Sequence, residues 1–215
     1  NVLIASMAEP SKKKKRKRAW SDVASSCFKE LSLHARFSLL PHALDDVRVH
    51  IFASLQEQLI RYDDAIGGVP IKFFHIALAP GCRYGRVHWN DPHIFVDVRV
   101  QAIAFCPEVS QRLVGRVNKI GVDYIGLLVH GLFNASIAAD NLGELQYDER
   151  KDWWTHAGDA SAVVKLGTVV DFELTSFDHA DGLLSMHGKY ESIVGQGEAN
   201  GHIEPDTANN GEDRS

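Results

Sequence analysis

The chain has 215 residues, of which 45% are hydrophobic and 24% are charged, so it can form one large domain or two small ones with real cores. Its formal net charge is −5, and no apolar run approaches the roughly 20 residues that cross a bilayer, which excludes a helical membrane protein. The three cysteines, Cys27, Cys82 and Cys106, are far apart and give neither a disulfide framework nor a zinc-ligand spacing. We therefore expect a reduced intracellular protein without a metal or other cofactor.

The positive charge is concentrated near the N-terminus. Seven consecutive basic residues form one run, and the rest of the chain has 16 Lys and Arg against 28 Asp and Glu. Because like charges repel one another, residues 1–27 are predicted to be a disordered basic arm. The run indicates a nuclear localisation signal; the alternative is a solvated tail that touches nucleic acid weakly. Its members are Lys12, Lys13, Lys14, Lys15, Arg16, Lys17 and Arg18.

Residues 28–105 are predicted to form a small α+β module. Apolar and polar residues alternate at its start and again before its end, and a period of two is typical of half-buried strands. Between them, the spacing of apolar residues changes to that of a helix. In chain order we expect a strand over 32–39, a helix from the Asp pair at 45–46 to about 65, and strands over 69–78 and 93–105.

The helix is predicted from apolar residues that recur at every fourth position, which places them on one face. The preceding Asp pair stands where an N-cap and a first-turn acid belong, and a Gly pair at 67–68 ends the helix. We expect Phe52 and Tyr62 to flank the apolar stripe. The stripe itself consists of Val47, Ile51, Leu55 and Leu59.

The segment from Phe105 to Ile137 predicts three short strands separated by turns. It reads FCPEVSQRLVGRVNKIGVDYIGLLVHGLFNASI, with glycines at positions 115, 121, 126 and 131, where a small barrel needs a bend or a tight turn. This pattern is typical of the first half of a five-stranded OB barrel of the S1 type. Such barrels mostly hold single-stranded nucleic acid or a protein partner.

The second half of the barrel, which we expect to span residues 106–190, follows an interruption. A polar insertion is predicted at about 138–166, with a helical turn around Glu144 to Trp154. A strand over 167–177, a tight turn over 178–182 and a last strand over 183–189 are predicted to complete the barrel. The remaining residues, 191–215, are predicted to be a disordered acidic tail.

No catalytic cluster is predicted, because none of the 11 histidines stands in a metal-binding motif. A surface for single-stranded RNA needs stacking aromatic rings and a few cations, and the first three barrel strands supply both. The alternative is that the rings fill the small core. Residues 106–190 carry seven basic and twelve acidic residues, so we expect weak RNA binding. The candidate residues are Arg112, Arg116, Lys119, Tyr124, His130 and Phe133.

The segment from Phe105 to Ile137, together with LQEQLIRYDDAIGGVPIKFFHIAL upstream, resembles the RNA polymerase I stalk subunits of the Rpb7-type (seventh-subunit) family. The resemblance covers about 30–190. It implies an α+β tip module followed by an all-β S1-like OB barrel, in a non-catalytic subunit found in the nucleus and nucleolus. The implied partners are the RNA polymerase I core, a small stalk partner subunit, the polymerase I initiation factor and nascent single-stranded RNA.

Three other functions are weighed against this one. A free S1/OB-type RNA-binding protein would show salt-dependent RNA affinity in isolation, which the acidic barrel disfavours. The equivalent stalk subunit of another nuclear RNA polymerase would share the fold, but the FNASI sequence at the end of the segment favours polymerase I. An enzyme with an accessory barrel would need an acid–base or metal cluster within residues 28–105, and the sequence offers none.

Overall fold

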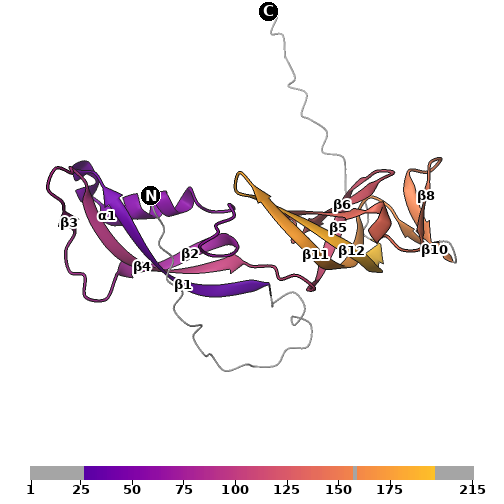
Figure 1. Ribbon diagram of the computed structural model, residues 1–215, viewed down its shortest axis with the longest axis horizontal. Coiled ribbons are helices and arrows are strands. Elements are labelled where there is room, and N and C mark those ends of the chain that lie inside the picture. The colour runs from indigo at the N-terminus through magenta and orange to yellow at the C-terminus, as the bar shows by residue number, and fades with distance from the viewer. Residues whose placement is uncertain (1–26, 157–158, 197–215) are drawn as a thin grey trace, which may run out of the picture.

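The computed structural model describes residues 27–156 and 159–196, with the side chains of 159–162 and 196 left aside. Two parts, built mostly of strands, follow one another along its long axis (Figure 1). The predicted localisation signal, Lys12–Arg18, lies outside the described residues, as do the rest of the basic arm up to residue 26 and the tail after residue 196. The disorder predicted for these segments stays a prediction.

The N-terminal part is the predicted α+β module, called the tip module below. An antiparallel sheet is formed in the order β1-β4-β2, and a short strand, β3, also pairs with β4. None of the helices in the described part of the chain is long and apolar enough to cross a membrane. The elements are β1 (Phe28–Leu39), η1 (Pro41–Leu44), α1 (Val47–Gln56), β2 (Val69–Leu78), β3 (Arg86–Val87) and β4 (Ile94–Phe105).

The helix begins as predicted and ends earlier. The Asp46 side chain accepts a hydrogen bond from the Val49 amide at 3.2 Å, as an N-cap does. Ile51 and Leu55 are buried, but α1 ends at Gln56, so the prediction of a helix to about residue 65 is wrong. Turns follow instead, because the amide of Ile60 donates to the carbonyl of Pro70 on β2 rather than to a preceding turn of helix.

Of the two residues expected to flank the helical stripe, Phe52 lies on α1 and Tyr62 lies beyond its end. Phe52 is 44% exposed, and Tyr62 packs against the core of the other module. The fully buried residues of α1 are Ile51 and Leu55.

The C-terminal part is a closed five-stranded barrel, as predicted for an OB fold. Its strands follow the order β11-β12-β7-β6-β5 and back to β11. All neighbours are antiparallel except β12 and β7, which run parallel with Ser185 opposite Asn134. The strands are β5 (Arg112–Ile120), β6 (Tyr124–Val129), β7 (Phe133–Ala138), β11 (Thr168–Ala180) and β12 (Leu183–Gln196).

The insertion between β7 and β11 forms a second small sheet, so the helical turn predicted around Glu144 to Trp154 is wrong. Trp154 is buried, and its indole N–H donates to the carbonyl of Gly121 at 3.1 Å, which pins the sheet to the turn between β5 and β6. The ring of Tyr147 lies 5.5 Å from that of Trp154 on the neighbouring strand. The elements are η2 (Ala139–Asn141), β8 (Leu145–Asp148), β9 (Trp153–His156) and β10 (Asp159–Val164), in the order β10-β9-β8.

The last two strands are longer than predicted. The turn that joins them is Asp181-Gly182, both with positive φ, at 52° and 79°, whereas Asp178 lies within β11. Strand β12 continues to Gln196, so residues 191–196 belong to the barrel and not to a disordered tail. Backbone pairing with β11 continues to Gln196, and it overrides the weak strand propensity of this polar segment.

The joint between the two parts is hydrophobic. Val69 and Phe105 come from the tip module, yet they are buried within the core of the barrel, as is Cys27, the residue directly before β1. The prediction of a disordered arm is therefore wrong for Cys27. The ring of Phe105 stacks on that of Phe133 at 4.1 Å, and the amide of Tyr62 donates to the carbonyl of Gly182 at 2.7 Å. The division of the chain into two domains at residue 105 stays a prediction. The contacts described above join the segments before and after this residue.

Candidate nucleic-acid interface

The six residues predicted to contact RNA do not form one surface. Lys119 and Tyr124 do come together, at the turn between β5 and β6, where the Lys119 Nζ atom lies 5.3 Å from the centre of the Tyr124 ring. Lys119 is exposed and Tyr124 is half-buried. A cation beside a partly exposed ring is a combination that holds a stacked base and its phosphate.

The two arginines of β5 have other partners. The Arg112 guanidinium donates to Glu191 at 2.9 Å and lies 3.8 Å from Asp171. Burial raises the pKa of Asp171, although Arg112 opposes the rise. The Arg116 Nε atom donates to the carbonyl of Gly167 at 3.3 Å. These contacts offset the charge of Arg112 and orient Arg116 along the barrel wall, so neither adds a free cation beside Tyr124.

His130 and Phe133 lie at the joint between the modules. The His130 ring is 5.0 Å from Phe28 and 5.9 Å from Phe105, and burial lowers its pKa. Phe133 is only 5% exposed and belongs to the barrel core. Its ring is therefore not available to a base, and the alternative that aromatic residues fill the core holds for Phe133.

A groove of about 420 Å³ opens beside Tyr124 on the barrel surface. Its lining is mostly small and polar, and it is contributed by four elements of the barrel and by η2. Gly188 is buried, and a Cβ atom there would come within 2.2 Å of the Phe172 ring in the barrel core, so this close packing of β12 requires glycine. The lining residues are Tyr124, Ser136, Ala138, Asn141, Thr175, Ser176, His187 and Gly188.

Two of the lining residues are paired across the parallel strands. Ser136 stands opposite His187 in the register, and its Oγ atom lies 2.9 Å from His187 Nδ1. The other ring nitrogen, Nε2, lies 3.5 Å from Asp178, and the Thr175 hydroxyl donates to the carbonyl of His187 at 2.8 Å. The groove thus presents hydroxyl groups and an imidazole with fixed orientations.

Ser136, His187 and Asp178 follow one another as in a Ser-His-Asp hydrolytic triad, but their exposure to water does not suit one. In a triad the acid is buried and orients the base. Here the Asp178 side chain is 82% exposed and that of His187 is 46% exposed, so water competes for both. Within residues 27–156 and 159–196, no three His, Cys, Asp or Glu side chains come together as a metal site requires. The arrangement suits hydrogen bonding to a polar ligand.

Sequence reasoning missed Ser136, Thr175 and His187. Thr175 meets His187 through the antiparallel hairpin of β11 and β12. Ser136 meets His187 because β12 pairs in parallel with β7, and a parallel pairing between distant strands leaves no local signal in the chain. The Asn134-Ala135-Ser136 sequence matches the glycosylation motif, which says nothing about a groove.

Comparison with known proteins identifies a family model that matches part of the barrel and relatives that match a longer stretch of the chain. Residues 107–152 match the family described as the RPA43 OB domain in RNA Pol I. The DNA-directed RNA polymerase I subunit RPA43 of Mus musculus is 34% identical over 134 residues, which are 62% of this chain and 39% of that protein. The Homo sapiens subunit of the same name is 32% identical over 153 residues, which are 71% of this chain and 41% of that protein.

For a more distant relative, the match covers most of the length of that protein. The DNA-directed RNA polymerase I subunit rpa43 of Schizosaccharomyces pombe is 25% identical over 152 residues, covering 67% of this chain and 83% of that protein. By contrast, the chain spans about two fifths of the length of the mouse and human relatives. The similarity thus extends beyond the barrel into the tip module, but much of the longer relatives has no counterpart in the match.

Proposed function

Because the chain belongs to the family of RPA43 subunits of RNA polymerase I, we propose that it acts as a non-catalytic stalk subunit of DNA-directed RNA polymerase I. In this role it supports initiation of ribosomal RNA synthesis. The observation that carries the proposal is the match of residues 107–152 to the RPA43 OB domain, in a segment that folds into part of a closed five-stranded barrel.

The proposed partners follow the two parts of the molecule. The tip module, residues 28–105, docks on the polymerase core, in company with a small stalk partner subunit. The barrel contacts the polymerase I initiation factor and takes up nascent single-stranded RNA beside Lys119 and Tyr124. The protein acts in the nucleus, and within it the nucleolus, to which Lys12–Arg18 direct it.

Affinity purification tests the main proposal. The full chain carries a tag and is recovered from nuclear extract, and mass spectrometry identifies the proteins that come with it. We expect the large subunits of RNA polymerase I in stoichiometric amounts. Recovery of polymerase II or III subunits in their place would contradict the proposal.

Deletion of residues 12–18 tests the localisation. Seven positive charges in a row are a typical import signal, so we expect the deleted chain to lose most of its nuclear fluorescence as a fusion protein. An unchanged nuclear signal would show that these residues are only a solvated tail.

A second candidate function, a free single-stranded RNA-binding protein, is favoured by the groove beside Tyr124. It predicts that the isolated chain binds a labelled oligoribonucleotide, that the affinity falls with salt, and that Tyr124→Ala and His187→Ala both weaken it. Binding that survives these substitutions would place the RNA elsewhere. Recovery of RNA without polymerase subunits in the purification above would favour this function over the stalk subunit.

A further inference from the structure

Two of the three cysteines meet at the end of the tip sheet that is nearest the barrel. Strands β1 and β4 pair without a shift in register as far as Phe28 opposite Phe105. Beyond this pair, the Cys106 amide donates to the carbonyl of Cys27 at 2.7 Å. The antiparallel pairing therefore continues by one residue and sets Cys27 opposite Cys106. The two residues lie far apart in the chain, so their spacing in the sequence gives no sign of this arrangement.

The spacing of such a pair suits a disulfide, although both residues keep their thiols in the structure. Directly opposite residues of an antiparallel ladder have Cα atoms about 4.5–5.5 Å apart, and a disulfide joins Cα atoms roughly 4.4–6.8 Å apart. The Cys106 Sγ atom lies on the side of Gly68, where an added Cβ atom would be 2.6 Å from it. A change to another staggered rotamer is needed to turn this thiol toward Cys27.

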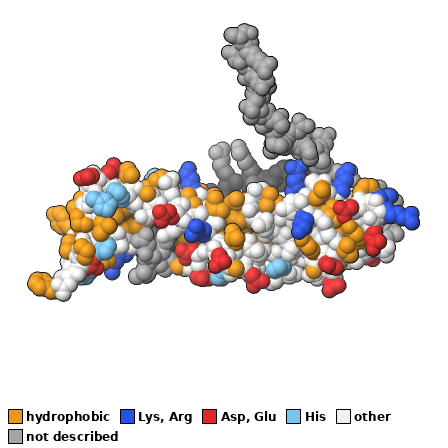
Figure 2. Space-filling view, turned by 90° about the horizontal axis from the view of Figure 1, so that it is seen from above, with side chains coloured by type: hydrophobic (Ala, Val, Ile, Leu, Met, Phe, Trp, Pro, Cys, Tyr) orange, Lys and Arg blue, Asp and Glu red, His pale blue; other side chains and the backbone are white. Residues whose placement is uncertain are grey.

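The pair lies where the two hydrophobic cores of the molecule meet. Cys27 is 0% exposed and packs in the core of the barrel, whereas Cys106 is 6% exposed and packs in the core of the tip module. On the face drawn in Figure 2, the surface runs without a break from the tip module to the barrel. A covalent bond between the two residues would therefore join the two cores at a protected position.

The surroundings slow the reaction of these thiols in the closed fold. Burial raises the pKa of the Cys106 thiol, although the Lys29 ammonium opposes the rise. Because a thiol reacts as its thiolate, Cys106 reacts slowly while it stays covered. Access requires opening of the start of β1, and strand ends open more readily than strand centres.

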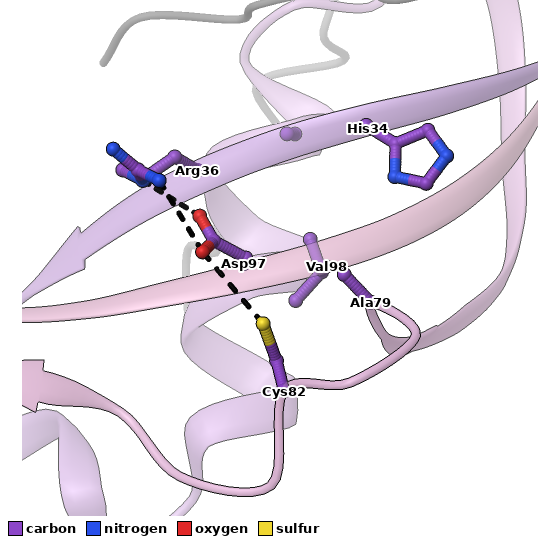
Figure 3. Close-up of a pocket in the computed structure, with 7 residues that line it drawn as sticks. His34, Arg36, Ala79, Cys82, Asp97 and Val98 are labelled. Carbon is purple, nitrogen blue, oxygen red and sulfur yellow. Dashed lines mark hydrogen bonds and ion pairs between the residues drawn. The ribbon is translucent and has the colours of Figure 1, made fainter.

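The third cysteine has a different setting. Cys82 is partly exposed beside a pocket of about 260 Å³, and its Sγ atom lies 3.8 Å from the Asp97 carboxylate (Figure 3). Asp97 precedes Cys106 on the path of β4 by nine positions, which is about 30 Å at the rise of a strand. Oxidation of Cys82 therefore cannot produce a bond to either of the other two cysteines.

We infer that Cys27 and Cys106 form a reversible disulfide, closed by glutathione disulfide, which locks the joint between the tip module and the barrel. The reaction consists of two thiol–disulfide exchanges. The Cys106 thiolate attacks glutathione disulfide, whose S–S bond breaks and releases one glutathione. The Cys27 thiolate then attacks the Cys106 Sγ atom and releases the second glutathione, and the two protons of the cysteines pass to the released thiolates. The lock is independent of the proposed function.

The bond would act on the segment through which the two modules are connected. Cys106 directly follows Phe105, whose ring stacks on that of Phe133 in the barrel, and Cys27 directly precedes β1. The closed loop, residues 27–106, contains the whole tip module. Closing a long loop removes conformational freedom from the unfolded chain, so the disulfide should stabilise the fold.

Metal binding is the other chemistry that a pair of thiolates allows, but a structural metal ion in a protein typically needs four ligands. Within residues 27–156 and 159–196, no cluster of three His, Cys, Asp or Glu side chains could hold an ion. A disulfide needs only the two residues that the sheet sets opposite each other.

The first experiment looks for the bond in the full chain with Cys82→Ser, which leaves Cys27 and Cys106 as its only cysteines. The folded protein is kept with excess glutathione disulfide at about pH 8.5, where thiolates are populated, until its mass no longer changes. We expect the mass to fall by that of two hydrogen atoms, and digestion without reduction to give peptides joined through the two cysteines. Excess reduced glutathione should restore both thiols.

The matched control is Cys82→Ser/Cys27→Ala, which keeps Cys106 and removes its partner. We expect this variant to gain the mass of one glutathione, because the second exchange cannot follow. In the Cys82→Ser chain, a final mixed disulfide, an unchanged mass, or a cross-link that forms only in urea would each overturn the inference.

The second experiment tests whether the bond locks the joint. The oxidised Cys82→Ser chain should melt several degrees above its reduced form, and the amides of residues 28–31 and 103–106 should exchange hydrogen more slowly. The Cys82→Ser/Cys27→Ala control should show no such rise in melting temperature after the same treatment. Equal melting temperatures and equal exchange in the two redox forms would overturn the lock.

Discussion

Two aromatic residues of the barrel, Tyr124 and Phe133, look alike in the sequence and differ in the structure. Both follow a glycine-bearing turn and both begin a strand. Tyr124 is half-buried beside Lys119, whereas Phe133 is 5% exposed and stacks on Phe105 at 4.1 Å. The joint between the modules decides the difference, because Phe105 reaches into the barrel from the preceding strand.

We predict that Phe133→Ala destabilises the chain far more than Tyr124→Ala. Truncation of a buried Phe typically costs about 3–5 kcal/mol, whereas a half-buried ring on the surface contributes much less. Urea unfolding of the two variants followed by circular dichroism measures both. Equal losses of stability would show that Tyr124 also belongs to the core and is not a contact for RNA.

His130 should make stability depend on pH. Although the residue is exposed, partial desolvation beside Phe28 and Phe105 lowers its pKa in the folded protein. At mildly acidic pH the unfolded chain therefore binds the proton more readily, and the contribution of His130 to the free energy of unfolding falls as pH drops below the ordinary His value of about 6.5. Unfolding in urea at pH 7.5 and pH 5.5 should show a smaller pH effect for His130→Asn than for the unaltered chain.

His75 offers a matched control for this measurement. Both residues are exposed, and the φ of His75, 51°, is close to the 52° of His130, so His75→Asn makes the same change on a similar backbone. We expect His75→Asn to keep the pH dependence of the unaltered chain. A reduced pH dependence in both variants would mean that the effect does not come from the Phe28 and Phe105 rings beside His130.

At the scale of the element, the helix of the tip module shows how far periodicity predicts structure. The stripe residues Ile51 and Leu55 are 2% and 1% exposed, as the spacing of four indicates. The end of α1 was not predictable in the same way. It depends on Ile60 donating to Pro70 of β2, a contact with a strand that comes later in the chain.

Leu55→Asp tests the buried face of α1. The substitution places a carboxylate among the sheet residues of the tip core, and an unpaired buried charge is strongly destabilising. We expect a large drop in the melting temperature, whereas Phe52→Asp, at a position that is 44% exposed, should change it little. An unchanged melting temperature for Leu55→Asp would mean that the helix packs with another face.

The hairpin of β11 and β12 supplies a second test. Gly182 has φ of 79°, and a Cβ atom there would lie 3.2 Å from the Cβ atom of Arg61 in the tip module. Gly131 has a similar φ of 72° with no atom within 4 Å of the position, so its substitution by Ala reports the backbone strain alone, roughly 1–2 kcal/mol.

We therefore predict that Gly182→Ala destabilises the chain more than Gly131→Ala, since it adds a tight contact with Arg61 at the joint to the same strain. Denaturant unfolding of the two variants gives the difference directly. If the two losses are equal, the hairpin does not press on the tip module in solution.

The strands were more predictable than the connections. The strands expected over 69–78 and 93–105 match β2 and β4 almost to the residue, and the first three barrel strands follow the glycine-punctuated pattern. The prediction of a helical turn in the insertion was wrong because Tyr147, Trp153 and Trp154 stand among charged residues with no clear period. Their strand conformation depends on contacts such as the bond from Trp154 to Gly121, which joins segments 33 residues apart.

At the scale of the whole molecule, the N-terminal part contributes side chains to the hydrophobic core of the barrel. The barrel core includes Val69 and Phe105 of the tip module and Cys27 directly before it, and Lys29 bonds Glu108 across the boundary at 2.6 Å. Removal of either part would expose these apolar side chains to water, at a free-energy cost of about 25 cal/mol for each Å². The parts are therefore expected to depend on one another for stability.

We predict that the chain unfolds in a single cooperative thermal transition. Differential scanning calorimetry of residues 27–196 should give one peak, and a fragment that begins at residue 107, which lacks Phe105, should melt at a lower temperature than the longer chain. Two separate peaks, with the fragment melting at the same temperature as one of them, would show that the parts are independent.

The parallel pairing of β12 with β7 also has a consequence for synthesis on the ribosome. The barrel closes through its last strand, and Leu127 and Ile137, which are 1% and 0% exposed in the finished fold, lie on strands that emerge well before it. Until Leu183–Gln196 leaves the exit tunnel, these strands are an open sheet with an apolar face in water. The nascent chain thus passes through a period in which chaperones have a surface to bind.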